Sequence, residues 1–358
     1  MNIGGSEEVP PHFLTSSPPD HLPKGSSTAV LLMNYGGPER AEDCEAYIRN
    51  IFLDPDLIPI PSLLRPLLAR IVGKRRAPTL RMNYEAMGQY SPILAQTNAQ
   101  AKALEASLGE GFKCFVGMRY WTPFIDEACC AIRSTAFSRV VLLPLYPQES
   151  RSTTGSSINE ARRCLEDLRF GGEVVEIRHF WGEAGYLETL AGGVAKALDE
   201  SPKGAHVLFS AHGLPVSVAK KDPYPGHVAL TVRAVCAKLG LELSPMDIPS
   251  GRVDGEPVRG ASRARASLAW QSKVGPAKWL EPSVEHMLER LAREGVKDIV
   301  LVPTVFVSEH SETLYELDVL YGGMARVLGM TVRRVPTVQT SPAFIEALAR
   351  KVKDALVP

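Results

Sequence analysis

The sequence predicts an α/β protein made of two similar doubly wound domains, each a parallel sheet covered by helices. The first observation is that short runs rich in Val, Ile and Leu alternate with longer segments of helical period. The second is an internal repeat: LLMNYGGP at 31–38 resembles LFSAHGLP at 208–215, and VVLLPLYP at 140–147 resembles IVLVPTVF at 299–306. Two domains of one topology account for both observations.

The apolar runs are continuous rather than alternating, which is typical of strands that are covered on both faces. We expect strands at 29–34, 113–118, 139–145, 173–180, 205–210, 266–270, 298–305 and 331–336. Helical period is found at 123–134, 186–198 and 282–295. Strands that alternate with helices in this way predict parallel sheets.

The expected domains each hold one copy of the repeat, the first at 29–181 and the second at 182–341. Residues 1–28 are rich in Pro and Ser and lack an apolar core of signal-peptide length, so we expect a disordered tail. The polar segment 241–267 has no periodicity and is expected to be an exposed insert. A helix at 342–358 is expected to cross back onto the first domain.

The composition excludes several classes of protein. Forty basic residues balance forty acidic ones, so the charge gives no support to nucleic-acid binding. No uninterrupted apolar stretch reaches the roughly 18 residues that span a bilayer. The six cysteines form no CxxC pair, a pattern that suits reduced thiols in a cytoplasmic protein. No dimer signature is visible, which leaves the oligomeric state open.

The repeat pairs Tyr35 with His212 and Tyr146 with Phe306, all at or just past the ends of expected strands. Ligands of open α/β sheets bind beyond the carboxyl ends of the strands. With two such domains, these ends can face each other across a cleft. We therefore expect all four residues at the mouth of that cleft.

A second group of titratable residues follows the strand at 298–305: Glu309, His310, Glu312, Glu316 and Asp318. A structural interpretation is available, because acidic residues stabilise the first turn of a helix and Ser308 or Ser311 could cap it. A chemical interpretation combines this group with His212 to transfer protons or to hold a divalent cation. The residues alone leave both interpretations open. Neither HExxH nor a three-ligand zinc pattern is present, which argues against a permanently held metal.

Aromatic and basic residues at other segment ends suit a flat apolar ligand that carries carboxylates. GMRYWTP contains Arg119 and Tyr120, and WQSKVGPAKW ends in Trp279. By the repeat, both segments follow equivalent strands, so we expect them to line the same cleft.

Three long motifs in register resemble the ferrochelatase family: SAHGLPVSVAKKDPYPGH at 210–227, WQSKVGPAKWLEP at 270–282 and LVPTVFVSEHSETLYELD at 301–318. The resemblance extends from about Ala29 to Val357. It implies two Rossmann-like domains around a porphyrin cleft, in agreement with the repeat. It also implies a lyase that inserts ferrous iron (Fe2+) into a porphyrin, with protoporphyrin IX as the expected substrate and haem as the product.

The resemblance implies roles for individual residues. His212 and Glu312 match the residues that bind iron and remove pyrrole protons, without saying which residue does which. His310 and Glu316 match a neighbouring proton path. The expected porphyrin contacts, to which the repeat adds Tyr146, are Tyr35, Arg76, Ser91, Arg119, Tyr120, Tyr146, Trp279 and Phe306. The chemistry agrees, because two protons must leave the macrocycle as the dication enters, and aromatic walls can buckle the ring.

The sequence also departs from some relatives. Arg151 occupies the first cysteine position of members with an iron–sulfur cluster, and the insert and the last residues lack cysteine, so we expect no cluster and no permanently bound cofactor. Leu320 stands where many relatives have a third acidic residue. The apolar, Pro-broken stretch 51–76 ends in a basic cluster and could be a core helix or a lip in peripheral contact with the cytoplasmic face of a membrane.

Alternatives to the expected activity are coproporphyrin III as the substrate, cobalt insertion into sirohydrochlorin, and a porphyrin or haem carrier without catalysis. The LYELD and WQSKVGP motifs speak against the sirohydrochlorin enzyme, and the presence of both His212 and Glu312 speaks against a carrier.

Overall fold

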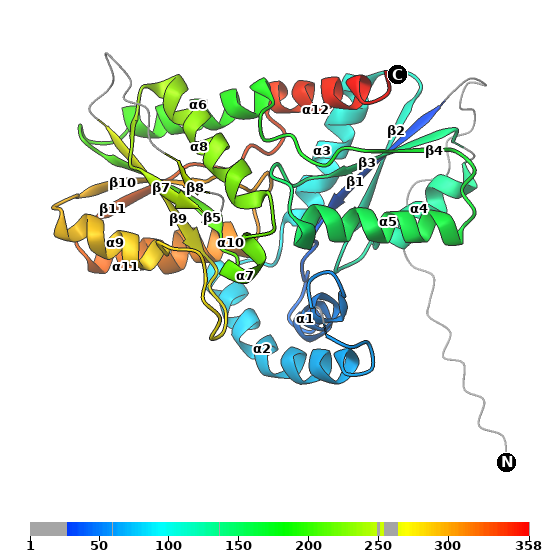
Figure 1. The fold of residues 1–358 in the computed structure, drawn as a ribbon, viewed down its shortest axis with the longest axis horizontal. Helices are drawn as coiled ribbons and strands as arrows, with labels where there is room; N and C mark the ends of the chain where they lie inside the picture. The colour runs from blue at the N-terminus through cyan, green and yellow to red at the C-terminus, as the bar shows by residue number, and fades with distance from the viewer. Residues whose placement is uncertain (1–26, 59, 136, 249–250, 254–263, 358) are drawn as a thin grey trace.

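The computed structural model describes residues 27–58, 60–135, 137–248, 251–253 and 264–357, and it contains two parallel sheets side by side (Figure 1). The first sheet has the order β2-β1-β3-β4 and the second the order β11-β10-β5-β9-β6. Their strands are β1 (Thr28–Asn34), β2 (Phe112–Met118), β3 (Arg139–Pro144), β4 (Glu173–Glu176), β5 (His206–His212), β6 (Glu242–Leu243), β9 (Arg265–Gln271), β10 (Asp298–Pro303) and β11 (Thr331–Arg334). A separate antiparallel pair is formed by β7 (Met246–Ile248) and β8 (Gly251–Val253).

Helices connect the strands and cover the sheets. The first half contains α1 (Asp43–Leu53), α2 (Arg65–Met87), α3 (Ile93–Leu108), α4 (Ile125–Ser134), the π-helix η1 (Arg151–Gly155) and α5 (Ser156–Asp167). Of these, α3, α4 and α5 pack against the first sheet. The second half adds α6 (Ala184–Asp199), α7 (Val216–Ala219), α8 (Tyr224–Leu239), α9 (Val284–Arg293), α10 (Ser311–Thr313), the π-helix η2 (Leu314–Tyr321), α11 (Gly322–Val327) and α12 (Pro342–Asp354).

The strand order confirms the predicted two-domain, Rossmann-like fold. The series β9-β5-β10-β11 in the second sheet repeats β2-β1-β3-β4 in the first, and the short β6 is added at the edge. The strand register repeats as well. Met33 pairs with Pro144 in the first sheet, and Ser210 pairs with Pro303 in the second. These are equivalent positions in the repeat, so the weak sequence similarity reflects a true structural duplication.

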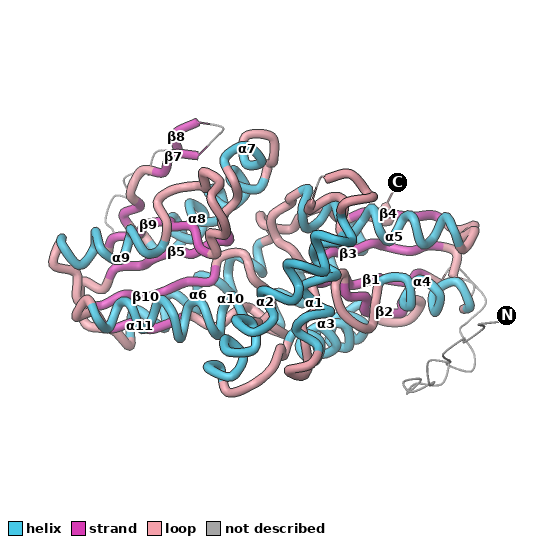
Figure 2. Tube along the Cα trace, turned by 90° about the horizontal axis from the view of Figure 1, so that it is seen from below, coloured by secondary structure: helices cyan, strands magenta, loops and turns pink. Residues whose placement is uncertain are grey.

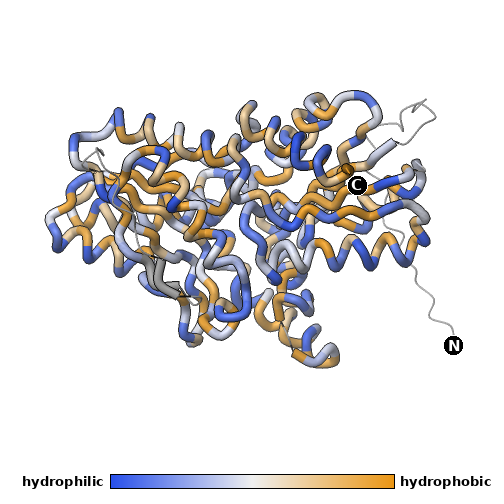
Figure 3. The backbone as a smooth tube through the Cα atoms, turned by 45° about the horizontal axis from the view of Figure 1, so that its top comes forward, coloured by the Kyte–Doolittle hydropathy of each residue, from blue (hydrophilic) through white to orange (hydrophobic). Residues whose placement is uncertain are grey.

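The strands are buried on both faces, as their continuous apolarity predicts. In β1, Val30 and Leu32 face one hydrophobic core, whereas Leu31 and Met33 face another that α4 and α5 cover. The first of these cores is continuous across both halves and includes residues of α3, α6, α8 and α12. Figure 3 shows hydrophobic segments running through the interior of both halves. Each fully buried Leu contributes about 2 kcal/mol to this core.

The structure corrects two expected boundaries. The strand β1 begins at Thr28, so the first sheet starts one residue earlier than expected, and residues 1–26 of the expected tail lie outside the described residues. The insert is shorter than 241–267, because β6 and the first residues of β9 belong to the second sheet and Leu241 is 1% exposed. Residues 249–250 and 254–263 of the insert also lie outside the described residues.

The C-terminal helix α12 packs against α3 and α6 at the boundary between the two halves (Figure 1). Phe344 and Leu348 of α12 are buried in the continuous core. This helix therefore contacts the first half as well as the second.

Candidate functional site

The side chains of His212 and Glu312 meet although they are 100 residues apart in the sequence: Nδ1 of the histidine lies 2.8 Å from Oε2 of the glutamate. His212 is the last residue of β5, and Glu312 follows the neighbouring parallel strand β10. Because carboxyl ends of parallel strands lie at one edge of a sheet, the fold brings the two together. Their side chains are 37% and 27% exposed, so a ligand can reach both.

The two groups stabilise each other's charge. Burial opposes ionisation of Glu312, but the charge of His212 and the hydrogen bond between them lower the carboxyl pKa to about 2. Burial likewise opposes the charged imidazole of His212. Its pKa is nevertheless raised above 6.5, by the charge of Glu312, by the hydrogen bond to Glu312 and by the charge of Glu316. With Nδ1 engaged by Glu312, Nε2 is the ring nitrogen that, once it has lost its proton, can take a proton or bind a metal.

A second carboxyl, that of Glu316, lies behind this pair. Its Oε2 accepts hydrogen bonds from Ser272 Oγ at 2.6 Å and from Gln271 Nε2 at 3.1 Å. Burial and the negative charge of Glu312 raise the pKa of Glu316 to about 7. It can therefore gain or lose a proton near neutral pH, which suits a group that passes protons onward.

The buried amide of Gln271 connects these groups, and the sequence reasoning did not single it out. Its Nε2 donates to the carbonyl of Glu312 at 2.9 Å as well as to Glu316, and its Oε1 accepts from Ser210 Oγ at 2.6 Å. Gln271 is 1% exposed and ends β9, the strand beside β5. Its position at a strand end, in the WQSKVGP motif, was the signal that could have identified it.

The helix that carries Glu316 differs from the expectation. The sequence indicated the first turn of a helix here, but the chain forms the short α10 and then the π-helix η2. Neither Ser308 nor Ser311 caps this segment, since His310 occupies the N-cap position. π-helical turns are frequent at functional sites. The first half also has a π-helix, η1, after the equivalent strand β3.

His310 presents an unsatisfied group at the site. Its Nδ1 is buried and has no hydrogen-bond partner among the described residues, and its ring lies 4.7 Å from that of Phe306. Burial lowers the pKa of His310, so the ring is neutral at neutral pH. A buried ring nitrogen without a partner is costly, and it can be satisfied by a ligand or a passing proton.

The other members of this titratable group have a structural role. Glu309 is 6% exposed, and its Oε1 accepts from Arg334 at 3.0 Å and from the backbone of Thr337 at 3.0 Å. Asp318 also pairs with Arg334, at 2.6 Å. Glu309 and Asp318 are thus paired with Arg334, whereas Glu312 is bonded to His212.

Three tyrosines of the first half form what we call the aromatic wall: Tyr35, Tyr120 and Tyr146. The Tyr35 ring packs edge-on against Tyr120 at 5.0 Å and Tyr146 at 5.7 Å between ring centroids. Burial, with the charges of neighbours that include Glu312, raises the pKa of Tyr35, so the wall is within electrostatic reach of the His212–Glu312 pair. Tyr120 is 1% exposed and supports Tyr35 from behind, with almost no surface to offer a ligand.

Local backbone features hold Tyr35 in place. Gly36 has a φ of 82°, and a Cβ there would lie 3.0 Å from Cβ of Trp121. A Cβ on Gly37 would collide with Ser91 Oγ, so Ser91 packs directly against the chain beside Tyr35. On the opposite half, Tyr224 donates to the carbonyl of His212 at 3.0 Å and fixes the end of β5.

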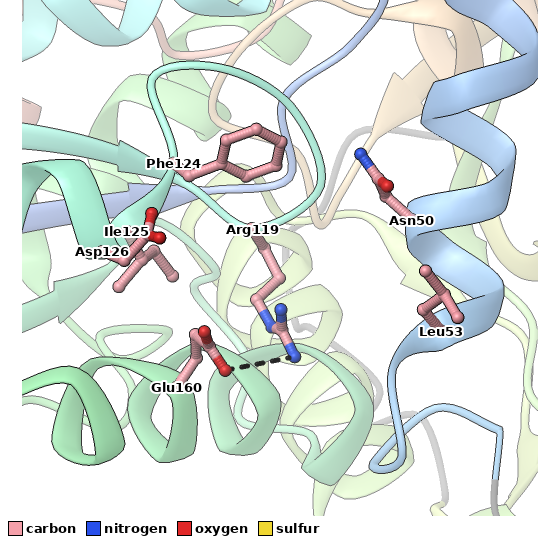
Figure 4. Close-up of a pocket in the computed structure, with 7 residues that line it drawn as sticks. All are labelled: Asn50, Leu53, Arg119, Phe124, Ile125, Asp126 and Glu160. Carbon is pink, nitrogen blue, oxygen red and sulfur yellow. Dashed lines mark ion pairs between the residues drawn. The ribbon is translucent and has the colours of Figure 1, made fainter. Parts of the chain in front are cut away.

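Arg119 is already neutralised within the protein. Its guanidinium lies 3.2 Å from Asp54 and 3.9 Å from Glu160, and its Nε donates to Ser156 at 2.8 Å. Asp54 also accepts from Tyr120 Oη at 2.6 Å. A pocket of about 310 Å³ opens beside Arg119 and not at His212; Figure 4 shows its lining residues Asn50, Leu53, Arg119, Phe124, Ile125, Asp126 and Glu160.

Three further residues were expected to contact the porphyrin: Arg76, Trp279 and Phe306. Arg76 is exposed on α2, and no hydrogen bond or ion pair among the described residues links it to the His212–Glu312 pair. Trp279 donates from Nε1 to the carbonyl of Val274 at 3.1 Å. It also forms an isolated antiparallel β-bridge with Pro215, in the segment that follows His212. Trp279 and Phe306 are both partly exposed.

The structure defines a two-domain α/β protein with a chelatase-like fold. Among solved structures, the sirohydrochlorin chelatase SirB from Bacillus subtilis subspecies spizizenii, in complex with cobalt, has a TM-score of 0.50 at 11% identity, with 92% of this chain and 95% of that chain covered. At this identity the likeness shows the fold alone.

Sequence comparison is more specific. The ferrochelatase family model matches residues 27–356. The ferrochelatase of Geotalea daltonii is 44% identical over 332 residues, which is 91% of this chain and 97% of the relative. That of Aquifex aeolicus is 41% identical over 328 residues, with 91% and 98% covered. The chain belongs to the ferrochelatase family, as its motifs indicated.

Proposed function

We propose that the protein inserts ferrous iron into protoporphyrin IX and so produces haem. The observation that carries the proposal is the partly exposed contact between His212, at the end of β5, and Glu312, in α10 after β10. In the part of the chain that the structure describes, no group of three or more His, Cys, Asp or Glu residues could hold a metal. A pair of donors with open positions suits an ion that arrives as a substrate and leaves in the product.

The reaction exchanges one Fe2+ for the two protons of the pyrrole N–H groups. His212 Nε2 and the carboxylate of Glu312 are the groups we propose to bind the iron and to accept the protons. Glu316 then receives a proton from this pair, because its pKa of about 7 allows it to exchange protons with the surroundings. We propose that the buried nitrogen of His310 belongs to the same path.

The aromatic residues supply the shape of the porphyrin site in this proposal. Tyr35, Tyr146, Phe306 and Trp279 contact the faces of the macrocycle, and Arg76 and Ser91 contact its propionates. Arg119 and Tyr120 act behind Tyr35 rather than on the propionates, because Asp54 and Glu160 already neutralise the guanidinium. A pre-formed wall of this kind can press on a flat ring and expose its nitrogen lone pairs to the metal.

The test is an anaerobic assay of purified protein with Fe2+ and each of two porphyrins. Metal insertion quenches the fluorescence of the free base, and we expect the faster loss with protoporphyrin IX. A faster loss of fluorescence with coproporphyrin III would show that protoporphyrin IX is not the preferred substrate, but the proposed iron insertion would stand. Tight porphyrin binding without insertion would support a carrier instead, and preference for cobalt and sirohydrochlorin would support the other chelatase activity.

We further propose that the protein is cytoplasmic and that the loop after α1 together with α2 makes peripheral contact with an anionic membrane surface. Among the described residues, no helix is long and apolar enough to cross a bilayer. Leu63, Leu64 and Leu67 are 88%, 57% and 62% exposed, and α2 continues into an exposed basic cluster, Arg70, Lys74, Arg75 and Arg76. Apolar side chains beside basic ones are typical of interfacial helices. Figure 1 shows α1 and α2 below the two sheets, so in the view from below α2 lies in front of them (Figure 2).

Sedimentation with vesicles that contain phosphatidylserine tests this contact. The combined change Leu63→Ser and Leu67→Ser should reduce binding at least about fivefold, since each buried CH₂ group contributes about 0.8 kcal/mol. Val327→Ser is the matched control, because Val327 is 89% exposed on α11, away from α2. Equal binding by both variants and the unaltered protein would contradict the proposal.

The absence of a permanently bound cofactor stays a prediction. Of the six cysteines, Cys44, Cys129, Cys164 and Cys236 are buried, and Cys130 is exposed. Metal and sulfide analysis of the purified protein should find no stoichiometric iron–sulfur cluster. A visible charge-transfer spectrum, together with sulfide in an amount that matches the iron, would contradict the prediction.

A further inference from the structure

One helix of the first half, α3, holds the segment that leads to Glu312 in the second half. Gln100 of α3 is fully buried, and its Nε2 donates to the carbonyl oxygens of Val307 and Gln339, both at 3.0 Å. Its Oε1 accepts from Ser308 Oγ at 3.1 Å. Both amide protons and the amide oxygen of this one side chain are therefore bonded to the opposite half.

A second glutamine one turn earlier extends the contact. Gln96 Oε1 accepts the backbone N–H of Glu309 at 2.7 Å. Residues 307–309 are therefore held by two side chains of α3 that lie on the same face of the helix. This segment runs directly from Phe306 to His310 and Glu312, so its position determines where these groups lie.

The same turn of α3 also holds the aromatic wall. Thr97, between the two glutamines, is fully buried and accepts from Asn34 Nδ2 at 3.1 Å. The Oδ1 of Asn34 accepts the backbone N–H of Tyr35 at 2.9 Å. One turn of helix is thus bonded to the residue before Tyr35 and to the segment before Glu312.

We propose that Gln96, Thr97 and Gln100 are positioning residues that fix the spacing between the aromatic wall and the Glu312 segment (residues 306–312). This inference rests on the proposed function, because that spacing must match a macrocycle held between the two. The hydrophobic core that joins the halves is non-directional and tolerates small shifts of one half against the other. Directional hydrogen bonds from buried amides remove that freedom.

The sharpest test uses Gln96, which contributes one bond through one oxygen. Gln96→Glu keeps an acceptor for the Glu309 N–H, whereas Gln96→Met has a similar shape and no acceptor. We expect the methionine variant to lose at least about tenfold in kcat with KM for the porphyrin within about twofold, because a shift of 1 Å at a reacting group can cost about 10²-fold. The glutamate variant should recover most of kcat. Equal kcat values for the two variants would overturn the inference.

Gln100→Met and a matched control complete the design. Gln148 is also a buried amide that joins the halves, since its Nε2 donates to Thr231 Oγ1 at 3.1 Å. Among the hydrogen bonds of the described residues, none links it to residues 307–309. Gln148→Met should keep kcat and should lower the melting temperature by less than Gln100→Met does, because Gln148 makes one hydrogen bond where Gln100 makes three. An equal loss of kcat in both folded variants would show a general effect on stability and would contradict the inference.

Failure of the inference can be told apart from failure of the proposed function. If the unaltered protein inserts no iron, the proposed function fails and with it the inference. If it inserts iron and the folded Gln96→Met protein keeps the same kcat, only the positioning role fails.

Discussion

The two halves of the molecule share strand order and register but carry different chemistry at their strand ends. In the first half, β1 leads to Tyr35, and the charged Arg119 is neutralised by Asp54. In the second half, β5 ends in His212, which faces the carboxylate of Glu312. The first half therefore presents rings and internally paired charges, whereas the second presents groups that titrate.

This difference shows how a duplicated scaffold can divide one task. A parallel sheet brings the carboxyl ends of its strands to one edge whatever residues stand there. Because there are two such edges, the one in the first half can contact the faces of the ligand, while the one in the second half can bind the metal and exchange protons. If the division is real, loss of the titratable groups of His212, Glu312 and Glu316 should lower kcat, and loss of the Tyr35 ring should raise KM for the porphyrin.

The largest effect is expected for His212→Ala. Loss of the group that accepts protons or binds iron should lower kcat by about 10²- to 10⁴-fold. His206→Gln is the matched control, because His206 is buried at the other end of the same strand and lies 3.1 Å from Ser267 Oγ. Steady-state assays should find His206→Gln close to the unaltered protein. A similar loss in both variants would contradict a special role for His212.

Glu312→Gln should lower kcat by about 10²-fold and should also change stability in a pH-dependent way. The lowered pKa of Glu312 stabilises the folded state above pH 4.5, and this contribution is lost as the pH falls toward 2. The raised pKa of His212 contributes below pH 6.5, and this contribution is lost as the pH rises past the folded pKa. The variant should therefore be most destabilised between pH 4.5 and 6.5.

Thermal unfolding at about pH 5.5 and about pH 8.5 measures this difference. A variant destabilised equally at both values would show that the pair does not carry opposite charges in the folded protein.

Tyr35→Ala is expected to act on binding. Removal of the ring at the centre of the aromatic wall should raise KM for the porphyrin by about tenfold, since a packed aromatic contact contributes about 1 kcal/mol beyond the area it buries. Tyr35→Phe keeps the ring and should stay within about twofold of the unaltered protein. Steady-state assays over a range of porphyrin concentrations measure KM and kcat for both variants. A fall in kcat with unchanged KM in Tyr35→Ala would break the division between the halves.

Glu316→Gln should have the smallest effect, a fall in kcat of about tenfold or less at neutral pH. Because the pKa of Glu316 is about 7, its carboxylate form increases as the pH rises through that value. The rate of the unaltered protein should therefore rise through the same range, and the variant should lose this rise. A pH profile that keeps the rise in Glu316→Gln would exclude Glu316 as its source.

The sequence predicted the duplicated fold and the meeting of His212 with Glu312 for one physical reason. Burial on both faces imposes continuous apolar runs, and the polar residues that follow such runs must lie at the edge of the sheet. Both signals are local and can be read along the chain.

Other parts of the site could not be read in this way. The π-helix η2 depends on hydrogen bonds that residue types do not specify, so an α-helix was expected there. The pairing of Arg119 with Asp54 joins residues of separate elements, and the sequence could not show that the guanidinium is already neutralised. Gln271 and Gln100 are amides without acid–base chemistry, and only their buried contacts show what they position.

The most direct test of the central claim is a double-mutant cycle on His212 and Glu312, with iron insertion and porphyrin binding measured on the same samples. Residues that act as one unit lose their contribution together, so His212→Ala combined with Glu312→Gln should lower kcat no further than the worse single variant does, with porphyrin binding retained. Losses that multiply in the double variant would show that the two side chains act independently, and the account of a single reacting pair would then be wrong.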